Sequence, residues 1–134
     1  MNFNKYGKLN NVQGSSGNKI KQLLRRHKQD GGVWHVQEKV HGSNFSIIYN
    51  GSEFRSGRRN GWIGEGQSFY NSEVVLEENK EYVKKIFTLV QNKFLNVKFI
   101  SVFGELCGGY YPHPDVEEDK TSTKVQRGVY YSPN

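Results

Sequence analysis

A segment in the middle of the chain constrains the fold most strongly, because it has the pattern of two strands joined by a tight turn. Residues 44–49 contain Phe, two Ile and Tyr, and the pair Asn50-Gly51 follows them directly. Asn-Gly is a pair that strongly favours a tight β-hairpin turn. We therefore expect residues 52–58 to return antiparallel beside residues 44–49, so that the chain builds its core around a hairpin.

The first 30 residues are predicted to contain one short, basic helix. Its apolar positions recur at the spacing of one helical face, at Ile20, Leu23, Leu24 and His27. Its two ends are marked by residues that cap or stop helices, namely Ser15, Ser16 or Asn18 and then Gly31-Gly32. Residues 1–30 contain seven bases and one acid, so the whole formal net charge of +6 lies there. This charge predicts a surface that binds a polyanion, with a solvated helix face as the alternative.

Further regular structure is predicted on both sides of the hairpin. Residues 33–40 alternate like a strand, and residues 97–106 are as dense in Val, Ile and Phe as a well-buried strand. The glycine-rich residues 57–66 indicate a loop. A helix of about five turns is expected after a cap at Ser72. Its apolar face would contain Val75, Tyr82, Ile86, Val90 and Phe94. The predicted class is α+β, a mainly antiparallel sheet with flanking helices.

Composition and motif content exclude several classes of protein. The length of 134 residues allows one domain or less. No apolar run reaches the 18 residues of a membrane span, and the polar start lacks the apolar core of a secretory signal. Cys107 is the only cysteine, which excludes an internal disulfide and fits a reducing, intracellular compartment. The sequence lacks GxxxxGK[ST], CxxC and HxxxH, so neither a P-loop nor a zinc site is expected.

Three polar clusters have the residue types that nucleotide chemistry needs. Lys39 ends the predicted strand 33–40, an arginine cluster occupies residues 55–59, and Glu105 lies at the end of the strand 97–106. Lysine supplies a nucleophilic amine, arginine supplies planar donors, and glutamate accepts hydrogen bonds from ribose hydroxyls. The ordinary alternatives are a surface lysine, solvated bases and a carboxylate bonded to the backbone. In combination, the clusters predict a nucleotide site.

These clusters, in this order, resemble the ATP-dependent RNA ligases of the RNA ligase 2 and trypanosome RNA-editing ligase type. Residues 39–42, Lys-Val-His-Gly, are similar to the nucleotidyl-lysine motif, in which DNA ligases and capping enzymes usually have aspartate instead of histidine. Residues 103–106, Phe-Gly-Glu-Leu, and 108–114 resemble the third motif and its downstream loop. Residues 126–133 resemble the segment before the next motif. Residues 3–6 resemble the start of such enzymes, which predicts that the beginning of the chain belongs to the fold.

The resemblance implies a fold, an activity and a set of site residues. It implies that residues 1–134 are the N-terminal portion of a covalent nucleotidyltransferase, or ATP-grasp-like ligase, fold. The implied cofactors are ATP and Mg²⁺ or Mn²⁺, and the implied partner is RNA with nicked or single-stranded ends. Lys39 would accept AMP, pass it to an RNA 5′-phosphate, and so prepare sealing by a 3′-hydroxyl. The implied nucleotide-binding residues are Glu38, His41, Gly42, Asn44, Arg59 and Glu105. The implied RNA-binding residues are Lys21, Arg25 and Arg26.

Some assignments stay open in the sequence. The family pattern of base, arginine, small residue and glycine best matches residues 58–61, which assigns the ribose contact to Arg59, with Arg55 and Arg58 as alternatives. On a strand, Glu38 would point away from Lys39 and would be a poor ion-pair partner for it. The alternative functions are a non-catalytic remnant that binds nucleotide or RNA, and a DNA ligase or capping-type nucleotidyltransferase.

The family's adenylylating domain continues beyond the residue that matches Asn134. An aromatic residue that stacks on adenine, a metal-binding glutamate motif and a final pair of lysines follow in the family. Phosphoryl transfer depends on positioning and on neutralisation of charge. We therefore expect this chain to be the N-terminal part of a ligase, active with its missing part or with a partner chain that supplies the C-terminal motifs.

Overall fold

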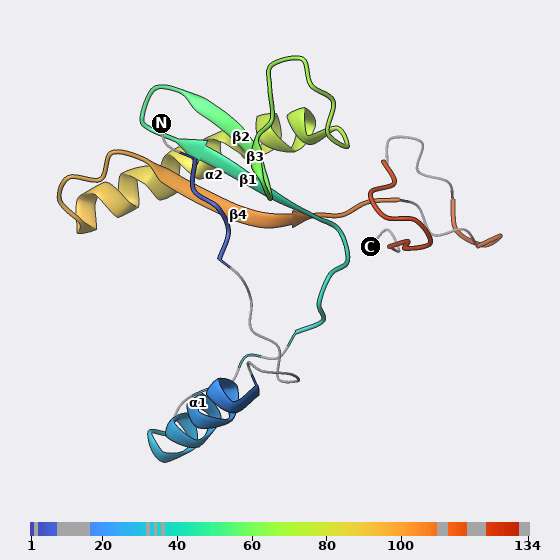
Figure 1. Cartoon of the computed structure of the whole chain (residues 1–134). Helices are drawn as coiled ribbons and strands as arrows, with labels where there is room; N and C mark the ends of the chain where they lie inside the picture. Colours follow the sequence, from blue (N-terminus) through green and yellow to red (C-terminus); the bar gives the residue numbers. More distant parts are fainter. Residues whose placement is uncertain are drawn as a thin grey trace. The chain divides into compact units, whose positions relative to one another are not determined.

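The computed structural model describes residues 1, 3–7, 17–31, 33, 35, 37–109, 113–117 and 123–131. The chain divides into two compact units, Gly7–Lys39 and Met1–Tyr6 with Val40–Asn134. The elements follow one another as α1 (Gly17–Gln29), β1 (Ser43–Tyr49), β2 (Phe54–Arg58), β3 (Gly61–Trp62), α2 (Ser72–Lys93) and β4 (Ile100–Leu106) (Figure 1). All pairs of neighbouring strands are antiparallel, which confirms the predicted α+β class.

The sheet has the strand order β3-β2-β1-β4, with β1 near its centre. The predicted hairpin is confirmed, because β1 pairs with β2 from Tyr49 opposite Phe54 onward. The turn itself lies one residue later than expected. The Asn50 N–H donates to the Glu53 carbonyl (3.4 Å), and Asn50 Oδ1 accepts from the Glu53 N–H (2.8 Å). Gly51 and Ser52 are therefore the central residues of the turn.

Helix α2 covers one face of this sheet and buries the main apolar core (Figure 1). Its Phe87 ring meets the ring of Tyr49 edge to face, with centroids 5.2 Å apart, and Val83 is also buried. The apolar face predicted for this helix is confirmed for Val75, which packs against the core, and wrong for Tyr82, Ile86 and Phe94, which are exposed. The Tyr82 side chain is 64% exposed and Ile86 is 41% exposed, because the ring of Tyr49 is contacted by Phe87 instead.

The first residues of the chain pack on the opposite face of the sheet. Phe3 meets Trp62 with ring centroids 5.2 Å apart, and Tyr6 meets Phe103 at 5.3 Å. Phe103 pairs with Ser46 of β1, which is fully buried between its neighbours. The prediction that the start of the chain belongs to the fold is confirmed for these residues.

The predicted strand at residues 33–40 is wrong for Val33, His35 and residues 37–40, none of which is in a strand. Trp34 and Val36 lie outside the described residues. Alternating side chains form a strand only where a neighbouring strand accepts the backbone hydrogen bonds. The described sheet consists of β3, β2, β1 and β4, and none of these strands pairs with the described residues of 33–40. The side chain of Val33 is 76% exposed, so the alternating pattern does not bury it in a core.

Several element boundaries also differ from the prediction. Ser72 is the first residue of α2 and is buried, whereas Asn71 occupies the N-cap position without a side-chain cap. Gly61 and Trp62 form the short strand β3 inside the predicted loop 57–66, because the chain turns back on β2 there. Strand β4 begins at Ile100 instead of residue 97.

The predicted basic helix is confirmed as α1. It begins at Gly17, so Asn18 lies inside it, while Ser15, Ser16 and Gly32 are not among the described residues. Leu23 and Leu24 are 58% and 38% exposed. Neither described helix combines the length and the hydropathy that a membrane span requires.

Candidate active site

The turn before β1 and the end of β4 meet at one end of the sheet. Asn44 pairs with Glu105 and Ser43 with Leu106, so the two strands bring the predicted motifs together. The Gly42 N–H donates a hydrogen bond to Glu105 Oε1 at 3.2 Å. Any side chain at Gly42 would overlap the backbone carbonyl of Leu106. The sequence therefore requires glycine here for close approach of two backbones.

Glu105 is exposed, which corrects the expectation that it ends a buried strand. Gly104 next to it is also exposed, whereas Leu106, the last residue of β4, is buried in the apolar core. Its hydrogen bond to the Gly42 backbone is the structural role that the sequence left open as an alternative to ribose binding. An ionised carboxylate has two oxygens and accepts several hydrogen bonds, so the backbone contact leaves capacity for a ligand.

Two residues of the segment 123–131 also form hydrogen bonds with this turn. The Tyr131 hydroxyl accepts from the His41 N–H (2.6 Å) and donates to the His41 carbonyl (2.9 Å). Gln126 Nε2 donates to the Gly42 carbonyl at 2.7 Å. Sequence reasoning assigned no role to either residue. The available signal was that both lie in residues 126–133, which resemble a family segment; Ser132 and Pro133 of that segment lie outside the described residues.

The segment 123–131 is itself anchored to the sheet unit. Val125 is buried in the apolar core. The Asn71 side chain donates to Thr123 Oγ1 at 2.6 Å, and a side chain at Gly108 would overlap the Thr123 carbonyl. This close backbone approach holds Gly108, the first residue of the loop that follows the third motif, next to Thr123. Residues 110–112 of that loop lie outside the described part of the chain.

The strand register places Arg59 closer to this end of the sheet than Arg55. Arg58 is opposite Phe45, and Arg59 follows it in the exposed turn between β2 and β3. Arg55 is opposite Ile48, towards the other end of β1. Its Nε donates to Glu53 Oε1 at 2.9 Å, and its guanidinium lies 5.6 Å from the centre of the Trp62 ring.

The remaining predicted residues lie in or next to the unit Gly7–Lys39. Lys39 is the last residue of that unit, and it precedes His41 by two residues. Glu38, Lys39 and His41 are all exposed. The predicted RNA contacts Lys21, Arg25 and Arg26 are exposed residues of α1. The bases Arg26 and Lys28 lie in the last turn of α1, where cations complement the helix dipole.

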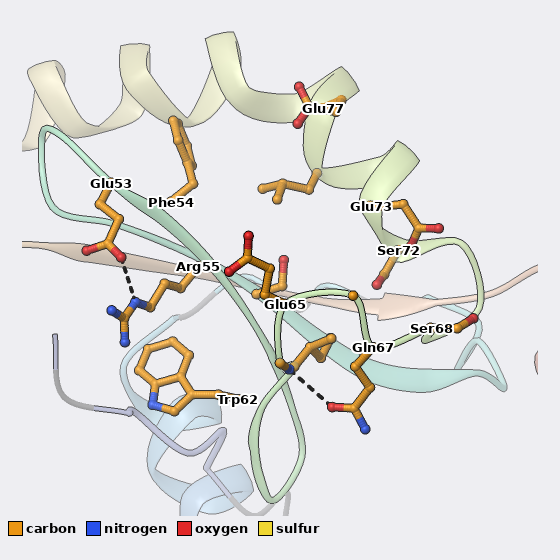
Figure 2. Close-up of a pocket in the computed structure, with 15 residues that line it drawn as sticks. Glu53, Phe54, Arg55, Trp62, Glu65, Gln67, Ser68, Ser72, Glu73 and Glu77 are labelled. Atoms are coloured by element: carbon orange, nitrogen blue, oxygen red, sulfur yellow. Dashed lines mark hydrogen bonds and ion pairs between the residues drawn. The ribbon is translucent and has the colours of Figure 1, made fainter.

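A separate cavity of about 840 Å³ lies between β2, β3 and the start of α2. Figure 2 shows carboxylates of Glu53, Glu65, Glu73 and Glu77 around it. Among the described residues that line the cavity, Arg55 is the only base. Such an excess of negative charge repels phosphate. We therefore do not assign the nucleotide to this cavity. Over the described ranges of the chain, no three His, Cys, Asp or Glu side chains form a group that can hold a metal ion.

Sequence comparisons relate the chain to one enzyme family. The model of the RNA ligase family matches residues 32–131, which include all three polar clusters. RNA-editing ligase 2, mitochondrial, of Trypanosoma brucei brucei (strain 927/4 GUTat10.1) is 33% identical over 97 residues, covering 69% of this chain and 23% of that protein. RNA-editing ligase 1, mitochondrial, of Trypanosoma brucei brucei is 29% identical over 101 residues, covering 71% of this chain and 22% of that protein. This chain thus spans about a quarter of the length of these relatives.

Proposed function

This chain belongs to the RNA ligase family, and we propose that it is the part of an ATP-dependent RNA ligase that forms the lysine–AMP intermediate. The observation that supports the proposal most is the hydrogen bond between Gly42 and Glu105. It joins residues of two family-like motifs, 63 positions apart, and Gly42 lies three residues after the proposed nucleophile Lys39. Incubation with ATP labelled at the α-phosphate tests this proposal, because AMP should become covalently attached to Lys39.

The proposed reaction begins with the amine of Lys39. The amine loses its proton and attacks the α-phosphate of ATP, so that an N–P bond forms and the bond to pyrophosphate breaks. His41 would contact the departing phosphates. Arg59 and Glu105 would bind the ribose, since a guanidinium donates and a carboxylate accepts hydrogen bonds.

The turn and strand residues around these groups would complete the pocket. Gly42 would shape the pocket by letting the turn lie against the end of β4. Asn44 is the second residue of β1, opposite Glu105, and would contribute its amide to the ribose–phosphate pocket. Glu38 is proposed as a further nucleotide contact next to Lys39. A divalent ion, Mg²⁺ or Mn²⁺, would neutralise phosphate charge when bound. We assign no ligand for that ion.

The alternative function is a non-catalytic part that binds nucleotide or RNA. A DNA ligase or capping-type enzyme is disfavoured because His41 stands where those enzymes usually have aspartate. The intracellular location stays a prediction from the single cysteine.

Residues 1–134 alone are expected to adenylylate weakly and not to seal RNA. The transition state of phosphoryl transfer carries charge that positioned cations must neutralise. The proposed site offers Lys39, His41 and Arg59 for this purpose. A nicked duplex RNA assay should show no sealing by residues 1–134, and sealing by a longer chain that adds a metal-binding glutamate and paired lysines. Efficient sealing by residues 1–134 would contradict the prediction.

Residues 1–30, which include helix α1, are expected to provide most of the affinity for RNA, because the whole formal net charge lies there. The change of Lys21, Arg25 and Arg26 to alanine should flatten the dependence of log affinity on log salt by about two to three units. Each phosphate contact that is lost means that fewer counterions are released when RNA binds. The matched control changes three exposed lysines elsewhere, Lys85, Lys93 and Lys98, to alanine. Equal slopes for the two triple variants would show that α1 has no special role in binding. Fluorescence anisotropy with a labelled RNA at several salt concentrations measures both slopes.

A further inference from the structure

We propose that Tyr131 and Gln126 are positioning residues for the adenylylation of Lys39. They fix the backbone of His41 and Gly42, and thus the short stretch of chain that follows the nucleophile. This inference rests on the proposed function, because it assigns these residues to the same reaction. Neither residue needs to contact ATP.

The Tyr131 hydroxyl restrains His41 on both sides of the residue. It accepts from the N–H (2.6 Å) and donates to the carbonyl (2.9 Å) of the same residue. A hydroxyl has one hydrogen to donate and lone pairs that accept, so a single side chain satisfies both groups. With both groups bound to one oxygen, neither peptide plane that flanks His41 can turn without breaking a hydrogen bond.

Gln126 and Glu105 extend the restraint to the next residue. Gln126 Nε2 donates to the Gly42 carbonyl (2.7 Å), while the Gly42 N–H donates to Glu105 Oε1 (3.2 Å). The N–H and the carbonyl of both His41 and Gly42 are therefore held by side chains 63 to 90 residues away in sequence. These hydrogen bonds fix the path of the backbone at His41 and Gly42, although neither residue belongs to a strand.

The two positioning residues are supported by a fixed segment. Val125, next to Gln126, is buried in the core, and the Tyr131 N–H donates to the Gly109 carbonyl at 3.4 Å. Thr123 is bound by Asn71 at the start of α2. A residue can position another residue only when it is itself held in place, and these contacts hold Tyr131 and Gln126. Lys39 is exposed and precedes this turn by two residues in the sequence, so a fixed turn limits the positions that its amine can reach.

The test compares Tyr131→Phe and Gln126→Met with the parent protein. Each variant removes hydrogen-bonding groups and keeps the side chain's approximate size. We expect faster amide hydrogen exchange at His41 and Gly42 in both variants. In single-turnover reactions with labelled ATP, we expect the maximal rate of Lys39 adenylylation to fall roughly 10- to 100-fold, as small displacements of a reacting group cost about that much. The ATP concentration at half-maximal rate should stay unchanged.

Tyr130→Phe is the matched control. It removes the neighbouring hydroxyl, which is bound by Lys124 Nζ at 2.8 Å, and should leave both measurements unchanged. A parental rate in both Tyr131→Phe and Gln126→Met overturns the inference while leaving the proposed function intact. If the variants raise only the ATP concentration at half-maximal rate and leave the maximal rate unchanged, the inference is also overturned, because that result indicates direct contact with ATP. If the parent protein itself attaches no AMP to Lys39, the proposed function fails and the positioning role fails with it.

Discussion

Lys39→Ala is expected to abolish covalent attachment of AMP to the protein. The alanine variant has no amine at the position that follows the family-like motif, so no N–P bond can form there. Lys39→Arg should be equally inactive, because a guanidinium stays protonated and is not a useful nucleophile. Labelling with α-³²P-ATP and magnesium, followed by denaturing electrophoresis, measures both effects.

The control for this prediction is Lys28→Ala. Lys28 is another exposed lysine of the unit Gly7–Lys39, and it has no proposed role in the reaction. Its replacement should leave the labelling at the parental level. Undiminished labelling of Lys39→Ala would show that the nucleophile is a different residue.

Gly42→Ala is expected to destabilise the end of the sheet and to suppress adenylylation. The added methyl group would overlap the Leu106 carbonyl and approach Glu105 Cγ to 3.1 Å. The turn and the end of β4 would have to separate, which breaks the hydrogen bond between Gly42 and Glu105. Forced overpacking of this kind costs about 1–3 kcal/mol of unfolding free energy. Urea unfolding and α-³²P-ATP labelling of the same preparation measure the two effects.

Gly104→Ala is the matched control, since it lies in β4 next to Glu105 and a methyl group there meets no atom within 4 Å. It should change the unfolding free energy little and leave labelling near the parental level. If Gly42→Ala is as stable and as active as Gly104→Ala, the close approach of the two backbones has no functional importance.

Local patterns were sufficient to predict the hairpin and α2, because each depends on neighbouring residues. They also indicated β4 through its dense run of Val, Ile and Phe, although its partner β1 lies far away in the sequence. They could not decide which side of α2 is buried. Tyr82, Val83, Ile86 and Phe87 are all apolar, so two overlapping faces satisfy the helical spacing. The contact of Phe87 with Tyr49 selects one of them, and that contact depends on the packing of a distant strand. The strand expected at residues 33–40 fails for a similar reason, since alternation says nothing about an available partner strand.

The motifs predicted which residues form the candidate site, and their roles in it stay predictions; the contacts that only the tertiary structure defines were not predicted. The meeting of Gly42 with Glu105 follows from the order of the family-like motifs and the antiparallel register. The hydrogen bonds of Tyr131 and Gln126 to the turn join residues 90 and 84 positions apart. Neither spacing nor composition indicates such a pairing.

The most direct measurement is to map the AMP-bearing residue by mass spectrometry. The protein is incubated with ATP and magnesium, digested, and searched for peptides heavier by the mass of one AMP. We predict that the modification lies on Lys39, that Lys39→Ala lacks it, and that GTP gives far less product than ATP. AMP on another lysine, or a preference for GTP, would contradict the assignment of this chain's site to an ATP-dependent RNA ligase.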